Sequence, residues 1–232
     1  RVVQHWSPAT TCGAGVRYGE RVLGWESTES GVTVRTDHAT YSASKLLIAA
    51  GAWSRDLLSS LGIKLRVLRK HLHWYAATNE CYRLDSGCPG FFYEVPGGHF
   101  YGFPQIDERG VKVADHTGVT EIADPLNDDR SPEAYDVQRI EGFLAQYLPR
   151  VSTVANDHAT CFYTMSPDDH FIVDRHPRHD NVVFAAGLSG HGFKFTSVLG
   201  EVLADLVTGG ATRLPIEFLR CGRFEPLAGS EQ

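Results

Sequence analysis

Apolar and polar residues alternate through the first part of the chain, as they do in paired strands. The alternation predicts strands at residues 15–18, 21–26 and 31–36. Residues 45–50 are apolar without alternation, which is typical of a buried parallel strand. This run ends in the turn Gly51-Ala52-Trp53, after which residues 54–62 predict a short helix closed by Gly62.

Aromatic residues dominate the middle of the chain. Residues 65–120 carry His73-Trp74-Tyr75, Phe91-Phe92-Tyr93 and Phe100-Tyr101-Gly102-Phe103 between proline and glycine turns, and this pattern predicts an antiparallel sheet. A helix is expected from Ser131 to about Tyr147, because serine caps helices and Pro132 suits a first turn.

A glycine-rich turn follows the apolar run at residues 182–186 and precedes helically spaced apolar residues at 198–206. Gly187, Gly190 and Gly192 permit positive φ and close backbone approach, and a helix N-terminus favours negative charge. His191 and Lys194 add a titratable ring and a cation, with Lys194 expected on the first helical turn. The turn is therefore either an ordinary connection or a site for an anion or a polarised carbonyl.

Composition excludes several classes of function. The chain has 232 residues and a net charge of −6 with both signs scattered, which argues against nucleic-acid binding. No apolar run reaches the roughly 20 residues of a membrane span and no signal peptide is apparent, so a cytoplasmic location is the default. Five cysteines, an odd number without metal-ligand spacing, argue against a disulfide framework or a metal site and leave at least one thiol free. The start at Arg1 suggests a piece of a longer protein.

Two segments carry further candidate chemistry. Lys112 and His116 lie four residues apart in a strand context and would share one face of a sheet, although a surface lysine is the commoner outcome. Cys161 lies beside Tyr163 and before a proline-aspartate turn, where most free cysteines are simply buried apolar residues.

Five motifs occur in the order and approximate spacing of one enzyme family. They are Gly51-Ala52-Trp53, Tyr101-Gly102-Phe103-Pro104, Lys112 with His116, Cys161-Phe162-Tyr163-Thr164, and the turn from Gly187 to Lys194. From about residue 15 to 224 the chain resembles the monomeric sarcosine oxidase and N-methyltryptophan oxidase family. The resemblance implies an α+β (α/β) fold with part of a doubly wound FAD-binding domain at 1–64 and 151–232, and an antiparallel-sheet substrate domain at 65–150.

The resemblance also implies roles for individual residues. Cys161 would form a thioether to FAD, and Lys194 would bind the substrate carboxylate. Lys112, His116, Tyr101 and Tyr163 would be the catalytic residues, with Lys112 near flavin N5, where it promotes reduction of O₂, and the other three lining the amine pocket. The residues expected to contact the cofactor, besides Cys161, are Gly51, Trp53, Gly187, Gly190, His191 and Gly192.

The activity implied is FAD-dependent oxidation of a secondary N-methyl amino acid by O₂, which yields the amino acid, formaldehyde and hydrogen peroxide. The implied partners are a small amino acid substrate and O₂, and the implied oligomeric state of the enzyme is a monomer. The family's GxGxxG turn, ribose-binding acid and second carboxylate-binding arginine would lie N-terminal to this sequence. The alternatives are a related pipecolate or fructosyl amino acid oxidase or dehydrogenase, and an inactive flavoprotein fragment that serves as a binding module.

Overall fold

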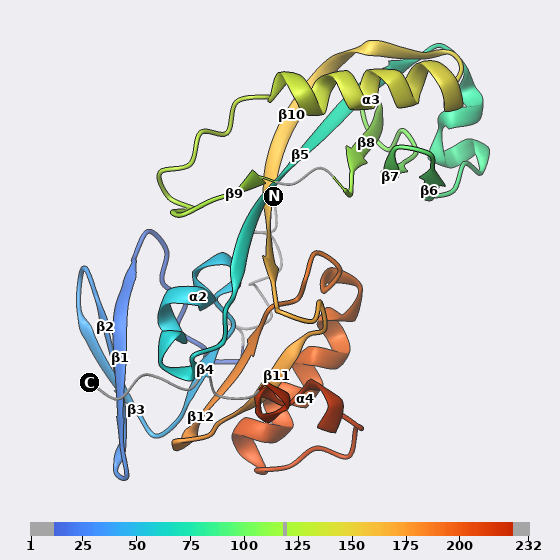
Figure 1. The fold of residues 1–232 in the computed structure, drawn as a ribbon. Helices are drawn as coiled ribbons and strands as arrows, with labels where there is room; N and C mark the ends of the chain where they lie inside the picture. Colours follow the sequence, from blue (N-terminus) through green and yellow to red (C-terminus); the bar gives the residue numbers. More distant parts are fainter. Residues whose placement is uncertain (1–11, 118–119, 225–232) are drawn as a thin grey trace.

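The computed structural model describes residues 12–117 and 120–224. The chain forms two lobes joined by a pair of long strands, β5 (Arg66–Ala77) and β10 (Val151–Met165), which run antiparallel and extend from one lobe into the other (Figure 1). Mixed helix and sheet of this kind confirms the predicted fold class.

A small sheet containing parallel strands forms the centre of one lobe. β4 (Leu46–Ile48) pairs parallel with β12 (His179–Ala186), and β12 pairs antiparallel with β11 (Ile172–His176). The absence of alternation in β12 is explained by its position, since both of its faces are buried. Helix α4 (Thr196–Thr208) packs Leu199, Val202, Leu203 and Leu206 against this sheet, as the helical spacing predicts.

A three-stranded meander lies beside this small sheet, formed by β1 (Val22–Thr28), β2 (Gly31–Thr36) and β3 (Thr40–Ala43). Two of the three strands predicted there are confirmed, but residues 15–18 form no strand. Tyr18 is 62% exposed and Gly19 has a left-handed φ of 65°, which ends any extended segment directly after residue 18. After β4, the short helix α2 (Ser54–Leu57) and a 3₁₀ turn end at Gly62, whose φ of 69° is the left-handed conformation expected of a closing glycine.

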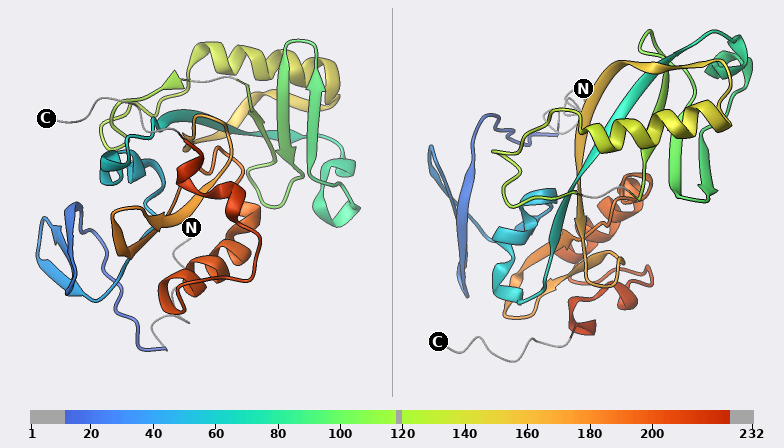
Figure 2. Two further views of the ribbon diagram at one scale, coloured as in Figure 1. Left: turned by 60° about the horizontal axis from the view of Figure 1, so that its bottom comes forward. Right: turned by 45° about the horizontal axis from the view of Figure 1, so that its top comes forward.

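The other lobe contains the predicted antiparallel sheet. Its strands lie in the order β10, β5, β8 (Val111–Asp115), β7 (Gly98–Phe103) and β6 (Phe91–Val95), and β9 (Thr120–Glu121) pairs with β5. Helix α3 (Ala134–Tyr147) covers one face, as both views in Figure 2 show, and the core between them is rich in aromatic and branched side chains. Strands from both sides of residue 150 build this sheet, since β10 pairs along β5. The division of the chain into domains stays a prediction.

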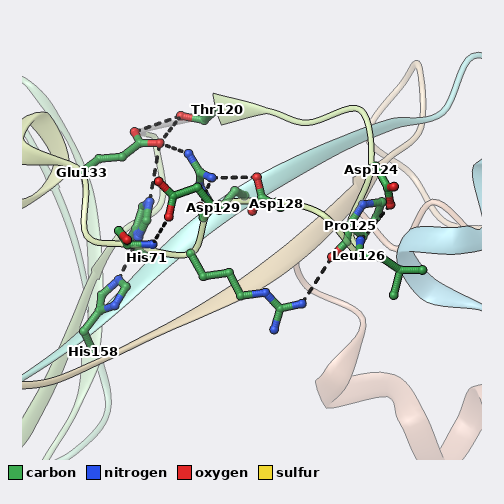
Figure 3. A network of polar contacts seen from close by, with 12 residues as sticks. His71, Thr120, Asp124, Pro125, Leu126, Asp128, Asp129, Glu133 and His158 are labelled. Carbon is green, nitrogen blue, oxygen red and sulfur yellow. Dashed lines mark hydrogen bonds and ion pairs between the residues drawn. The ribbon is translucent and has the colours of Figure 1, made fainter. Parts of the chain in front are cut away.

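Helix α3 begins three residues later than the sequence predicts. The backbone N–H of Ser131 is bound by the carboxylate of Asp129, so this serine lies in a turn before the helix rather than at its cap. Glu133 takes the cap position without capping, because its carboxylate accepts a hydrogen bond from Thr120 (Figure 3) and also binds Arg69 of β5. Tertiary contacts therefore override the local capping signal here. None of the helices in the described ranges combines the length and the apolar character that a membrane crossing requires.

Candidate functional site

Strand register places most of the predicted site residues on one face of the antiparallel sheet. Directly paired residues of neighbouring strands share a face, and so do residues two or four apart on one strand. The register pairs are Cys161 with Lys70, Trp74 with Lys112, Phe103 with Lys112, and Tyr101 with Ala114. Cys161 and Tyr163 are two apart, and Lys70 and Trp74 four apart. We call this surface of the sheet the site face.

The opposite face of the sheet has a different composition and a different role. It carries Tyr75, Phe100, Val111 and Val113, which are buried beneath α3. The alternation of the strands therefore separates a packed core from a polar and aromatic surface. Lys112 and His116 fall on the latter side because they are four residues apart, and His116 extends the strand by donating its N–H to the carbonyl of His99 at 2.7 Å.

Three predicted pocket residues converge at one end of the site face. The hydroxyl oxygens of Tyr101 and Tyr163 lie 3.4 Å apart. The imidazole of His116 lies 6.1 Å from the Tyr101 ring and 5.8 Å from the Tyr163 ring, measured between ring centroids. Two phenols and an imidazole thus surround one small region and offer both donors and acceptors to a polar ligand.

The glycine-rich turn packs directly against this group. The N–H of Ser189 donates to the carbonyl of Thr164 at 2.9 Å, which fastens the turn to the end of β10. Gly190 has a φ of 80°, and a Cβ there would lie 2.4 Å from the Tyr163 ring. Gly187 has a φ of 58° and approaches Ser166. Gly192 departs from the expected positive φ, with a φ of −73°, and needs to be small because Leu188 fills the space of a side chain.

Burial shifts the ionisation of the group in one direction. It raises the pKa of the phenols of Tyr101 and Tyr163, so both remain protonated. Burial lowers the pKa of His116, and the positive charge of Lys70 lowers it further. The pKa of His191 is lowered by burial and by the charge of Lys194. The pocket therefore presents uncharged hydrogen-bonding groups inside a positively charged surrounding.

Cys161 and Lys112 lie farther along the site face. Cys161 is half-buried, and burial raises the pKa of its thiol while the charges of Lys112 and Lys70 act in the opposite direction. The ammonium group of Lys112 lies 5.6 Å from the Trp74 ring and 5.4 Å from the Phe103 ring, and burial lowers its pKa. These rings and Lys112 line a hollow of about 300 Å³.

The remaining predicted residues lie at the margins. Lys194 is exposed in the 3₁₀ turn Phe193–Phe195 before α4, not in the first turn of α4 itself, and its ammonium group lies 5.8 Å from the Phe195 ring. Gly51, with a φ of 53°, and Trp53 belong to a 3₁₀ turn that contacts β10. Trp53 also lines a hollow of about 1240 Å³ beside β1 and α2, which holds none of the converging pocket residues.

Sequence reasoning missed one buried charge on the site face. Lys70 is 2% exposed, and its ammonium group donates to the carbonyl of His116 at 2.7 Å and lies 5.4 Å from the Tyr163 ring. In the sequence it follows Arg69 and precedes His71, within a run of mixed basic and apolar residues that has no clear alternation. A lysine in such a run is ordinarily expected to be solvated.

Comparison with known proteins identifies the family of this chain. Residues 7–206 match the family model described as FAD dependent oxidoreductase. The chain is 39% identical over 215 residues to a monomeric sarcosine oxidase of Bacillus sp. (strain NS-129), covering 91% of the chain and 55% of that protein. It is 39% identical over 198 residues to an N-methyl-L-tryptophan oxidase of Citrobacter koseri, covering 84% and 51% respectively.

Solved structures show the same fold. The open form of NikD, an unusual amino acid oxidase essential for nikkomycin biosynthesis, has a TM-score of 0.75 at 25% identity, covering 91% of this chain and 56% of that one. A glycine oxidase from Geobacillus kaustophilus has a TM-score of 0.73 at 21% identity, covering 94% and 55%. The chain thus spans about half the length of the relatives it matches, and it belongs to the FAD-dependent oxidoreductase family.

Proposed function

We propose that the complete protein is a monomeric, cytoplasmic enzyme that oxidises a secondary N-methyl amino acid of the sarcosine or N-methyltryptophan type. The products are the free amino acid, formaldehyde and hydrogen peroxide, formed from the substrate, O₂ and water. The observation that carries this proposal is the convergence of Tyr101, His116 and Tyr163 beside the turn at Gly190, in a chain 39% identical to a sarcosine oxidase.

The residues present fit a flavin. The half-buried thiol of Cys161 stands on the site face, two residues from Tyr163, where it is available for a covalent bond. Trp53 and Phe193 are 39% and 90% exposed, so both rings are accessible to a bound cofactor. FAD, when bound, supplies the two-electron oxidation of the amine. Gly187, Gly190, His191 and Gly192 would hold it at the positive end of α4.

The pocket residues suit a small amino acid. The uncharged imidazole of His116 and the phenols of Tyr101 and Tyr163 orient the amine by hydrogen bonds. Lys194 is the expected partner of the carboxylate, since it is an exposed cation electrostatically coupled to His191. Lys112, which two aromatic rings surround, offers a desolvated positive charge that favours reduction of O₂.

Covalent attachment gives the sharpest test. The full-length protein with Cys161→Ser should release all its flavin on acid precipitation, whereas the parent protein should retain it in the pellet. Cys88→Ser is the matched control, because Cys88 is also partly exposed but lies outside the site face. Covalent flavin that survives in Cys161→Ser would contradict the assignment.

Substrate recognition is tested separately. In the full-length enzyme, Lys194→Met should raise KM for the amino acid roughly 30-fold, about 2 kcal/mol, and have a much smaller effect on its methyl ester. The exposed Lys64 provides the control Lys64→Met, which should leave both substrates unaffected. Equal effects on acid and ester would place Lys194 away from the carboxylate. Formaldehyde and peroxide formed in equal amounts would support the reaction, and their absence would refute it.

A further inference from the structure

Lys70 is a buried cation to which neither the sequence pattern nor the family resemblance assigns a role. It belongs to β5, is 2% exposed, and stands directly opposite Cys161 on β10. A lysine buried to this degree costs free energy unless charges and hydrogen bonds compensate it. Its position on the site face places that charge next to the candidate pocket.

The side chain of Lys70 contacts two pocket residues. Its ammonium group donates to the backbone carbonyl of His116 at 2.7 Å, where β8 has just ended. The same group lies 5.4 Å from the centroid of the Tyr163 ring, within the range of a cation–π interaction. One side chain therefore connects β5 to the end of β8 and to β10.

Carboxylates keep this charge in place. Burial lowers the pKa of Lys70, and the charges of Asp115 and Asp136 act against that effect. Asp115 is itself held by Arg139 of α3 through a 2.5 Å ion pair. The ammonium group is thus supported from the α3 side of the sheet while it acts on the site face.

We propose that Lys70 is a positioning residue of the amine pocket, which holds the backbone of His116 and the ring of Tyr163 in place and supplies the pocket with a fixed positive charge. The naming of the pocket rests on the proposed function. The contacts of Lys70 with His116 and Tyr163 do not.

The fixed charge has a chemical consequence for the imidazole. The groups that act on His116 are Lys70, His191 and His99, which lower its pKa, and Asp115, which raises it. Burial acts in the same direction as Lys70. With Lys70 in place, His116 stays uncharged and can accept a hydrogen bond from an amine. A positive surrounding also favours the uncharged form of a bound amine, which is the form that gives up electrons.

The experiment is a titration of His116 by NMR in the full-length protein, prepared without flavin and without substrate. The resonance is assigned by its loss in His116→Gln. In Lys70→Gln, which keeps an N–H donor and loses the charge, the pKa of His116 should rise, because the positive charge is removed and Asp115 is no longer offset. Lys70→Arg should restore the parent value, and Lys64→Met, at an exposed lysine of the same chain, should leave it unchanged.

Each outcome decides the proposal. An unchanged titration of His116 in a folded Lys70→Gln would overturn it, and so would an upward shift that Lys70→Arg fails to reverse. Circular dichroism and the unfolding midpoint establish that each variant is folded, and Lys70→Met serves as the second neutral variant if Lys70→Gln does not fold. Because no turnover is measured, a failure here leaves the proposed function standing, and loss of covalent flavin or of activity would not alter this titration.

Discussion

Replacing Gly190 by alanine should destabilise the protein, although the change adds only one methyl group. The backbone there has a φ of 80°, and a left-handed conformation costs a non-glycine residue about 1–2 kcal/mol. The new Cβ would also lie 2.4 Å from two carbon atoms of the Tyr163 ring, so the ring or the turn must move. Overpacking of this kind typically costs about 1–3 kcal/mol. The expected loss in the free energy of unfolding is therefore about 2–5 kcal/mol.

A matched control lies ten residues away. Gly200 is inside α4, and a Cβ there would meet no atom within 4 Å. Gly200→Ala should stabilise the protein by about 0.5–1 kcal/mol, because alanine favours a helix interior. The same substitution thus has opposite signs at the two positions.

Urea unfolding of the two variants and the parent protein measures both effects, provided that the slope of the transition is unchanged. Comparing the double variant Gly190→Ala/Tyr163→Ala with Tyr163→Ala alone divides the Gly190 penalty into its parts. Without the ring the clash is absent, so Gly190→Ala should cost only the backbone strain of about 1–2 kcal/mol. A Gly190→Ala protein within about 0.5 kcal/mol of the parent would refute the close packing of the turn on Tyr163.

Three further results are expected. Two hydrogen bonds from Arg223 help lower the pKa of Asp168 to about 2, so the pair stabilises the fold above about pH 4 and loses this effect as the pH falls to about 2. Arg223→Met should therefore flatten the fall of Tm between pH 4 and pH 2, and an unchanged slope would contradict this. Burial lowers the pKa of His176 to about 4, so the stability due to its uncharged form is present above about pH 6.5 and is lost as the pH falls to about 4. His176→Gln should remove the fall of Tm that this histidine causes over that pH range, and an unaltered Tm profile would contradict the prediction. In hydrogen exchange, the backbone amides of β12 should be more protected than those of β4, because β12 lies between two strands and β4 pairs with only one strand among the described residues. Equal protection of the two strands would show that the side of β4 away from β12 is also covered.

The parts of the fold that could be predicted from the sequence are those whose signal is local. The apolar run of β12 lacks alternation because both of its faces are buried, and the turn after it is indicated by its glycines. The shared face of Lys112 and His116 follows from the geometry of any strand, since residues four apart point the same way. These predictions needed no knowledge of what packs against the segment.

The parts that could not be predicted depend on distant partners. The start of α3 is set by Arg69, which draws the carboxylate of Glu133 away from a capping role across 64 residues of sequence. Residues 15–18 have the composition of a strand and pair with no strand among the residues that the structure describes. In both cases the local preference is weaker than a contact, or the lack of one, that only the folded chain reveals.

Lys70 combines both difficulties, and for that reason the candidate pocket was only partly visible in the sequence. In β5 both faces of the sheet are covered over much of the strand, so the burial pattern does not alternate and cannot assign Lys70 to a side. Its assignment comes from register with Cys161, and its contact with His116 joins strands 46 residues apart. Motifs can thus name candidate ligand-binding residues, whereas a buried neighbour such as Lys70 is found only through the pairing of strands.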